Sequence, residues 1–177
     1  MRKRRIDNEW VILEELRAMN PERLLAPTRD TDNFYLTLQR TPALYTRPHA
    51  LDAWTASVRD THCVRVFFPR YYPAMPCEVY VGDSVFHPNA HPDTGFVCLW
   101  ERHLAMHTVG HALTQLSAIL SGKLFNRDER HVMQPDALAF YLQPEAAARL
   151  PLPCPSLLTP ERLQAAPDRR ILRRRLS

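Results

Sequence analysis

The sequence lacks the segments that would carry a protein into or across a membrane. Its 177 residues contain no apolar run of about eighteen residues, the length that a membrane-spanning helix needs. The basic start, Met-Arg-Lys-Arg-Arg, is not followed by an apolar stretch, so we expect no secretory signal. These absences predict a protein that does not enter a membrane.

The sequence also lacks closely paired cysteines and has few lysines. The four cysteines form no CxxC pair and no spacing typical of a disulfide framework, which predicts free thiols in a reducing cytoplasm. Lysine occurs only as Lys3 and Lys123 among 23 lysines and arginines. Two explanations stay open: a GC-rich genome, or avoidance of modification on the protein's own lysines.

The residues that are present suffice for one domain with a hydrophobic core, followed by a tail. Hydrophobic residues make up 45% of the chain, an ordinary fraction for a globular protein. Arginines gather at both ends, and prolines dominate from residue 150 on. We predict a domain over 1–149 and a Pro/Arg-rich tail over 150–177, with one short helix over 159–166. The arginines at 169–175 are interpreted as a solvated tail; binding to nucleic acid or to an acidic partner is the less favoured alternative.

Apolar residues recur at helical spacing in three segments. Residues 3–19 have Ile6 and Leu13 among the members of one apolar face. A second helix is expected over 108–121, ended by Gly122, and a third over 135–149 with a disturbance at its internal proline, Pro144. The predicted domain therefore begins and ends with helices.

Between the helices the pattern changes to that of strands. Alternating or β-branched apolar residues predict four strands, at 33–40, 53–58, 61–68 and 77–81. The second and third are expected to form a hairpin that turns at Arg59-Asp60. Together with the helices, this order predicts an α+β fold, in which a four-stranded antiparallel sheet is flanked by an N-terminal helix and C-terminal helices.

The segment 86–98, Phe-His-Pro-Asn-Ala-His-Pro-Asp-Thr-Gly-Phe-Val-Cys, has the parts needed for acyl transfer. Cys98 supplies a thiol nucleophile, and the side-chain amide of Asn89 can donate a hydrogen bond to the oxyanion that forms when a carbonyl is attacked. Pro88 fixes φ beside that donor and limits its movement.

The order of elements and these residues together resemble the ubiquitin-conjugating enzymes, the middle enzymes of the ubiquitin cascade. The likeness runs from about residue 3 to residue 143. It rests on four motifs in order: Phe-Phe-Pro-Arg-Tyr-Tyr-Pro-Ala-Met-Pro, Val-Phe-His-Pro-Asn, Thr-Gly-Phe-Val-Cys-Leu and Phe-Asn-Arg-Asp-Glu. The resemblance implies a four-stranded antiparallel sheet flanked by helices, in agreement with the pattern above.

By position, the resemblance assigns roles to residues of this segment. Cys98 matches the thiol that accepts the C-terminal carbonyl of a ubiquitin-like protein from an activating enzyme, and the chemistry so implied needs no cofactor. Asn89 matches the residue that supports the loop and stabilises the oxyanion, while His87 with Pro88 matches a structural turn. Asp128 lies where the family has an acidic residue that orients and deprotonates the incoming lysine, and the adjacent Glu129 is the alternative.

The resemblance also implies partners. Arg2, Lys3, Arg4 and Arg5 match the basic helix that the family offers to an acidic domain of its activating enzyme. The loops at 70–75 and 104–108 match places where a ligase docks, and a protein substrate supplies the amine. The family's glycine-rich turn and its "WSP" segment are absent here, which favours a bacterial relative. Such relatives commonly lie in operons beside a ubiquitin-like protein, some of them serving phage defence.

Other interpretations stay open for several residues. His103, His107 and His111 are spaced four apart and could form a metal site, although surface or ligase-loop histidines are favoured and no metal is expected. Cys63, Cys77 and Cys154 are interpreted as ordinary core thiols.

Three functions compete at this stage. The favoured one is a conjugating enzyme that carries a thioester. The alternatives are a non-catalytic interaction module of the same fold, and an unrelated cysteine hydrolase that would need a histidine such as His111 within hydrogen-bond reach of Cys98.

Overall fold

The structure is a computed structural model that describes residues 2–45, 57–82 and 85–160. In these ranges no helix is both long and apolar enough to cross a membrane. The elements follow in the order α1 (Arg2–Met19), β1 (Leu24–Asp30), β2 (Asn33–Leu38), β3 (Ala43–Tyr45), β4 (Ser57–Arg59), β5 (His62–Phe67), β6 (Glu78–Val81), β7 (Phe96–Val97), α2 (Val109–Leu120), α3 (Pro135–Tyr141) and α4 (Pro144–Ala147).

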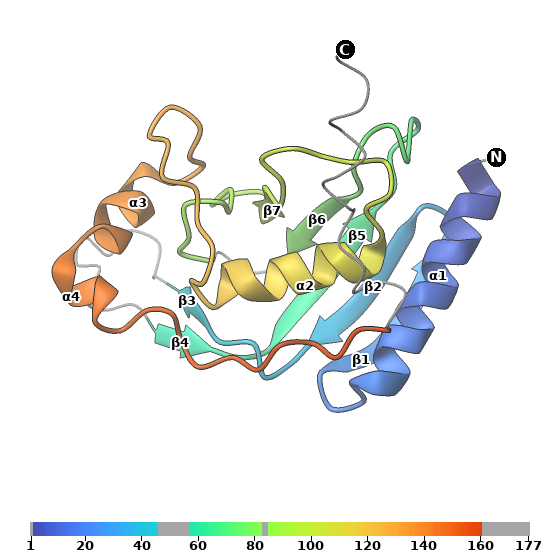
Figure 1. The fold of residues 1–177 in the computed structure, drawn as a ribbon, viewed down its shortest axis with the longest axis horizontal. Coiled ribbons are helices and arrows are strands. Elements are labelled where there is room, and N and C mark those ends of the chain that lie inside the picture. The colour runs from blue at the N-terminus through green and yellow to red at the C-terminus, as the bar shows by residue number, and fades with distance from the viewer. Residues whose placement is uncertain (1, 46–56, 83–84, 161–177) are drawn as a thin grey trace, which may run out of the picture.

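A five-stranded antiparallel sheet, in the order β1-β2-β5-β6-β7, forms the centre of the molecule. Helix α2 crosses one face of it, and α1 lies along the side of β1 and β2 (Figure 1). Side chains alternate along β5, with His62, Val64 and Val66 buried and Cys63 and Arg65 exposed. The covered face therefore forms the core, and the opposite face is open.

The α+β class is confirmed, but the prediction of four strands is wrong in number and in pairing. β1 was missed because it is mostly exposed and contains Pro27, where a register shift interrupts the pairing with β2. β7 is only two residues long, too short to produce an alternating pattern.

The predicted hairpin at Arg59-Asp60 is also wrong. β4 pairs with β3 in a separate two-stranded sheet, while β5 pairs with β2 and β6. All three residues of β4 are exposed, so its apolar content did not reflect burial in the main sheet. The first part of the predicted strand, residues 53–56, lies outside the described residues.

The helix predicted over 3–19 is confirmed as α1. Ile6, Leu13 and Leu16 are buried on its inner face, and Trp10 packs edge-on against Phe34 with ring centroids 5.0 Å apart. The apolar stripe that predicted the helix is thus the face that covers the sheet.

One charged residue, Glu9, lies fully buried in that apolar face. Its Oε1 accepts a hydrogen bond from the Tyr72 hydroxyl at 2.7 Å and forms an ion pair with Arg5 Nε at 2.8 Å. Its Oε2 accepts the backbone N–H of Val109, the first residue of α2, at 2.7 Å. A carboxylate is stabilised at a helix N-terminus by the unpaired N–H groups and the helix dipole. Glu9 therefore joins α1, the loop of Tyr72 and α2.

The helices after the sheet were predicted correctly in outline. Thr108 caps α2, and Gly122, with φ of 75°, follows its end. The segment expected over 135–149 divides into α3 and α4, and α4 begins at Pro144, where the disturbance was predicted.

Residues 150–160 run back across the domain from α4 toward α1 (Figure 1), and we call this segment the strap. Leu157 is buried in the main core, and the backbone N–H of Leu158 donates to Asn20 Oδ1 at 2.9 Å. Lys123 Nζ donates to the Cys154 carbonyl at 2.6 Å. The predicted helix over 159–166 and the arginines at 169–175 lie almost entirely outside the described residues.

A buried arginine fastens the strap. Arg23, 7% exposed, donates to the Pro155 carbonyl and to Thr41 Oγ1, each at 2.7 Å, and to Ser117 Oγ at 3.1 Å. These acceptors belong to the strap, to the segment after β2 and to α2. Because all three are buried or partly buried, removing their donor would leave them without a partner.

We therefore expect Arg23→Met to lower the free energy of unfolding by about 1–3 kcal/mol, measured by urea denaturation. Hydrogen exchange at the Leu158 amide should also become faster. Arg29→Met is the matched control, because Arg29 makes an exposed ion pair with Asp7 whose loss costs about 0–1 kcal/mol. Equal losses in the two variants would contradict the role of Arg23.

Candidate active site

The His-Pro-Asn turn is held from inside the protein. The His87 ring is fully buried, and its Nδ1 accepts the backbone N–H of Asn89 at 3.0 Å. The edge-to-face contact with Tyr141 has ring centroids 5.0 Å apart. Burial lowers the pKa of His87 to about 3, against a smaller opposite effect of the Leu124 backbone, so the ring is a neutral acceptor.

The side chain of Asn89 joins two loops. Its Nδ2 donates to the Cys98 carbonyl at 2.9 Å, and its Oδ1 accepts the backbone N–H of Asn126 at 2.8 Å. The Asn89 carbonyl in turn accepts the backbone N–H of Cys98 at 2.8 Å. Main chain and side chain of one residue therefore fix the backbone of Cys98 on both sides of its Cα.

The Cys98 thiol is half-buried in a groove of about 800 Å³. Its hydrogen-bond acceptor is the Trp100 carbonyl, 3.9 Å from Sγ. In the described part of the chain no imidazole hydrogen-bonds to this thiol, a finding against the cysteine hydrolase. The groove is lined by Asn89, Cys98, Leu99, Trp100, Glu101, Gln115, Ile119, Leu124, Phe125, Asn126, Arg127, Asp128 and His131.

The loop opposite Cys98 contains Asp128, which lines the groove, and Glu129, which is exposed but does not line it. Asp128 Oδ1 accepts the backbone N–H of Arg130 at 3.0 Å, and Oδ2 lies 2.7 Å from His131 Nδ1. The hydrogen bonds from His131 and then from Arg130 lower the pKa of Asp128, so the carboxylate is ionised at neutral pH.

Comparison with family models and with the curated proteins gives no match to the sequence. Solved structures do match. A protein from Trypanosoma cruzi that is named as a ubiquitin-conjugating enzyme is similar with a TM-score of 0.58 and 18% identity, over 84% of this chain and 96% of that one. The chain has the fold of the ubiquitin-conjugating enzymes. One from Plasmodium yoelii is similar with a TM-score of 0.53 and 15% identity, over 81% and 86% of the two chains.

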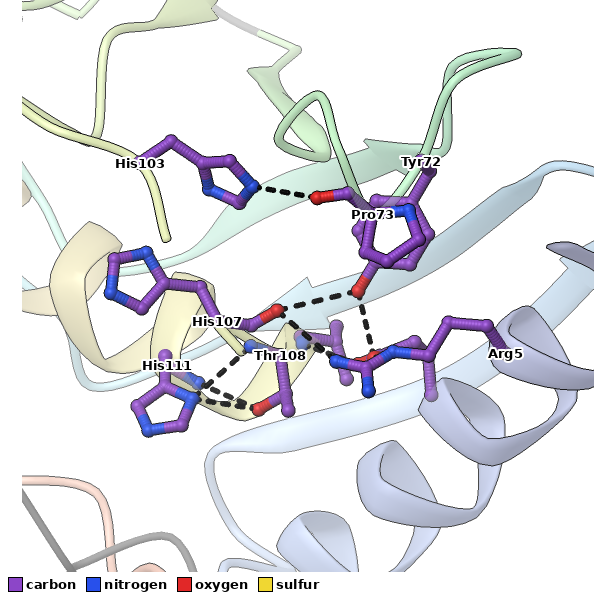
Figure 2. Close-up of polar contacts among 9 residues, drawn as sticks. Arg5, Tyr72, Pro73, His103, His107, Thr108 and His111 are labelled. Atoms are coloured by element: carbon purple, nitrogen blue, oxygen red, sulfur yellow. Dashed lines mark hydrogen bonds and ion pairs between the residues drawn. The ribbon is translucent and has the colours of Figure 1, made fainter. Parts of the chain in front are cut away.

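The fold brings the loops 70–75 and 104–108 side by side. His103 Nε2 is 2.9 Å from the Pro73 carbonyl, and the Tyr72 hydroxyl oxygen, whose proton goes to Glu9, lies 3.4 Å from the His107 carbonyl (Figure 2). Tyr71, Met75 and Met106 are exposed on these loops. The surface is therefore continuous across two segments that are distant in sequence.

The three histidines of the possible metal site are used in loop contacts. His107 Nδ1 accepts the Leu104 N–H at 3.3 Å. His111 Nδ1 accepts the Thr108 N–H at 3.1 Å (Figure 2). Burial, and then the neighbouring His103 and His111, lower the pKa of His107. Among the described residues no group of three His, Cys, Asp or Glu side chains could hold a metal ion.

The four basic residues at the start of α1 differ in their surroundings. Arg2 pairs with Asp32 at 2.8 Å and also donates to the Phe68 carbonyl, and Arg5 pairs with Glu9. Lys3 and Arg4 are exposed. Two of the four side chains are thus committed to the fold, and two are presented to solvent.

The other cysteines have no place in the groove. Cys77 is buried, and its burial, followed by the nearby Glu9, raises the pKa of its thiol to about 12. Cys154 is buried in the strap, whereas Cys63 is exposed on the open face of the sheet, so the expectation of a core thiol fails for Cys63.

From the sequence, no role was given to three residues whose contacts hold the site or the core. Asn126 was part of a quoted motif but received no role, and His131, three residues after Asp128, was not considered. Glu9 had a visible signal, because it falls on the apolar face between Ile6 and Leu13. A charged residue at such a position indicates a buried partner.

The burial of His87 predicts a stability that depends on pH. The folded protein keeps the ring neutral down to a pKa of about 3, whereas the unfolded chain takes up a proton near pH 6.5. The unfolded state then binds more protons, so the free energy of unfolding falls as the pH is lowered from about 6.5 toward 3. Relative to His87→Asn, whose Oδ1 still accepts the Asn89 N–H, wild type should lose about 1.4 kcal/mol per pH unit in urea denaturation. Parallel pH profiles would contradict this.

The start of α1 gives a second stability prediction. Arg5→Ala should lower the free energy of unfolding by about 1–3 kcal/mol, because the buried Glu9 carboxylate loses its ion-pair partner. Arg4→Ala, the neighbouring exposed control, should change it by less than about 0.5 kcal/mol. Thermal and urea denaturation of both variants measure the difference, and a larger effect of Arg4→Ala would refute this assignment.

Proposed function

We propose that the chain is a conjugating enzyme for a ubiquitin-like protein, which it accepts as a thioester on Cys98 and transfers to an amine of a target. The observation that carries the proposal is the double fixation of the Cys98 backbone by Asn89 inside an open groove. A fixed backbone holds the thiol in one position, and the groove leaves room for an extended acyl chain on one side.

In the first step the Cys98 thiolate attacks the thioester carbonyl carried by an activating enzyme. A new C–S bond forms as the old one breaks, so the energy of the thioester is kept and no cofactor is needed. Asn89 Nδ2 uses one N–H for the Cys98 carbonyl. Its second N–H is the donor that we assign to the oxyanion, and donors of this kind contribute about 10²–10³ in rate.

In the second step an amine replaces the thiol. The loop of Asp128 lies along the same groove as Cys98, and its carboxylate supplies the negative charge that attracts and orients an incoming ammonium group. His87 and Pro88 take no part in the reaction in this proposal and hold the turn.

Two surfaces are assigned to partners. Lys3 and Arg4 are the exposed cations that we assign to an acidic surface of the activating enzyme. Arg2 and Arg5 hold the start of α1 in place through their ion pairs with Asp32 and Glu9. The exposed Tyr71, Met75 and Met106 support ligase docking at the loops 70–75 and 104–108. A bacterial origin and a role in phage defence stay predictions.

The proposal predicts a reductant-sensitive adduct on Cys98. The probe is a fluorescent peptide α-thioester that ends in glycine, exchanged onto the protein without an activating enzyme and followed by intact mass spectrometry. We expect one peptide per chain on wild type and none on Cys98→Ala. Added lysine should discharge the adduct faster than water does, because the groove admits an amine.

The matched control is Cys63→Ala, since Cys63 is the exposed thiol outside the groove. It should load as wild type does. An adduct that persists in Cys98→Ala would sink the proposal, and an adduct that discharges to water alone would favour the hydrolase.

A further inference from the structure

The Asp128 carboxylate already has a partner on each oxygen. Oδ1 accepts the Arg130 N–H at 3.0 Å, and Oδ2 lies 2.7 Å from His131 Nδ1. These two hydrogen bonds lower the pKa of the carboxylate, which makes it a weaker base. A group so occupied is suited to holding a neighbour in place rather than to taking a proton from an ammonium group.

The hydrogen bond also decides the state of the imidazole. An ionised carboxylate only accepts, so the proton between the two residues belongs to Nδ1 of His131. In the neutral ring Nε2 then has the free lone pair. The His131 side chain is 75% exposed and lines the groove that contains Cys98.

A chain of hydrogen bonds fixes this pair relative to the nucleophile. Asn89 Oδ1 accepts the Asn126 N–H at 2.8 Å, and Asn126 Oδ1 accepts the Asp128 N–H at 3.0 Å. Asn126 Nδ2 donates to the His131 carbonyl at 3.1 Å, and the His131 N–H donates to the Asp128 carbonyl at 2.9 Å. The residue that fixes the Cys98 backbone is thus the first member of the chain that positions the imidazole.

We propose that His131 is the general base that takes the proton from the incoming amine, with Asp128 as its positioning residue. The inference rests on the proposed function and refines it, because it moves the proton acceptor from Asp128 to its partner. An imidazole whose Nδ1 carries the proton can accept a second proton at Nε2, which is the task of a general base. The other charged residues that line the groove are Glu101 and Arg127, and Arg130 faces the pair through its backbone N–H.

The step balances without a further reactant. The ammonium group gives one proton to His131 Nε2, and its nitrogen attacks the thioester carbonyl. The C–N bond forms, and the C–S bond breaks as the Cys98 thiolate departs. The thiolate takes the second proton from nitrogen, which leaves an amide, a thiol and a protonated imidazole that releases its proton to water.

The test uses wild type, His131→Asn, Asp128→Asn and Glu129→Gln, each loaded on Cys98 with the glycine-ended peptide thioester. Asn keeps an N–H close to the position of Nδ1 and has no group at Nε2, so the contact with Asp128 is retained while the base is lost. Glu129→Gln is the matched control, with the same change of charge in the same loop outside the groove. Each adduct is discharged at pH 7 with free lysine, and separately with hydroxylamine, which is already unprotonated at that pH.

We expect all four proteins to load equally and to discharge to hydroxylamine at one rate. Discharge to lysine should be about 10²-fold slower in His131→Asn, slower in Asp128→Asn, and unchanged in Glu129→Gln. Raising the pH should reduce the defect of His131→Asn, because lysine then loses its proton to solvent.

Three outcomes would overturn the inference. If the His131→Asn adduct discharged to lysine at the wild-type rate, the imidazole would not be the base. A defect confined to Asp128→Asn would return that role to the carboxylate. An equal loss with lysine and hydroxylamine would show a structural role only. Failure of wild type to load on Cys98 would instead refute the proposed function itself, and with it this inference.

Discussion

The arrangement of the molecule depends on the buried carboxylate of Glu9. A charge in an apolar interface is costly unless every lone pair has a partner, and here the partners come from three places: Arg5 on its own helix, the hydroxyl of Tyr72 and the first N–H of α2. The cost of leaving any of them unpaired keeps α1, the Tyr72 loop and α2 in one arrangement. Gln115 and Ile119 of α2 line the groove at Cys98. Glu9, which binds the first residue of the same helix, therefore helps to fix the position of this groove wall.

In the candidate site, side-chain amides connect separate segments by hydrogen bonds, as the Glu9 carboxylate does in the core. Asn89 uses both Oδ1 and Nδ2 for hydrogen bonds to the backbone. Asn126, on the facing loop, does the same. Each is a short side chain that replaces secondary structure where the chain has none. Two irregular loops are thereby joined by hydrogen bonds, and under the proposed function this positions the residues that must meet a reacting carbonyl.

The sequence predicted those parts of the fold whose pattern is local. α1 and α2 have long apolar faces, and both were predicted within about two residues. β1 was not predicted because it is mostly exposed and interrupted by a register shift, and β7 because it has only two residues. Their place in the sheet follows only from pairing with β2 and β6. For the site, His-Pro-Asn and the following cysteine were visible as a motif, whereas Asn126 and His131 act through contacts across a loop that no spacing rule reports. The pairing of β4 with β3 failed for the same reason, because it is decided by tertiary contacts.

The hydrogen bond from Lys123 to the strap has a consequence for the lifetime of an acylated form. Lys123 comes directly before Leu124 and Phe125, two residues that line the groove of Cys98. The Lys123 side chain donates to the Cys154 carbonyl at 2.6 Å and is therefore turned toward the strap. The strap thus restrains the lysine closest in sequence to the groove, and under the proposed function a thioester on Cys98 would persist until an amine arrives from another molecule.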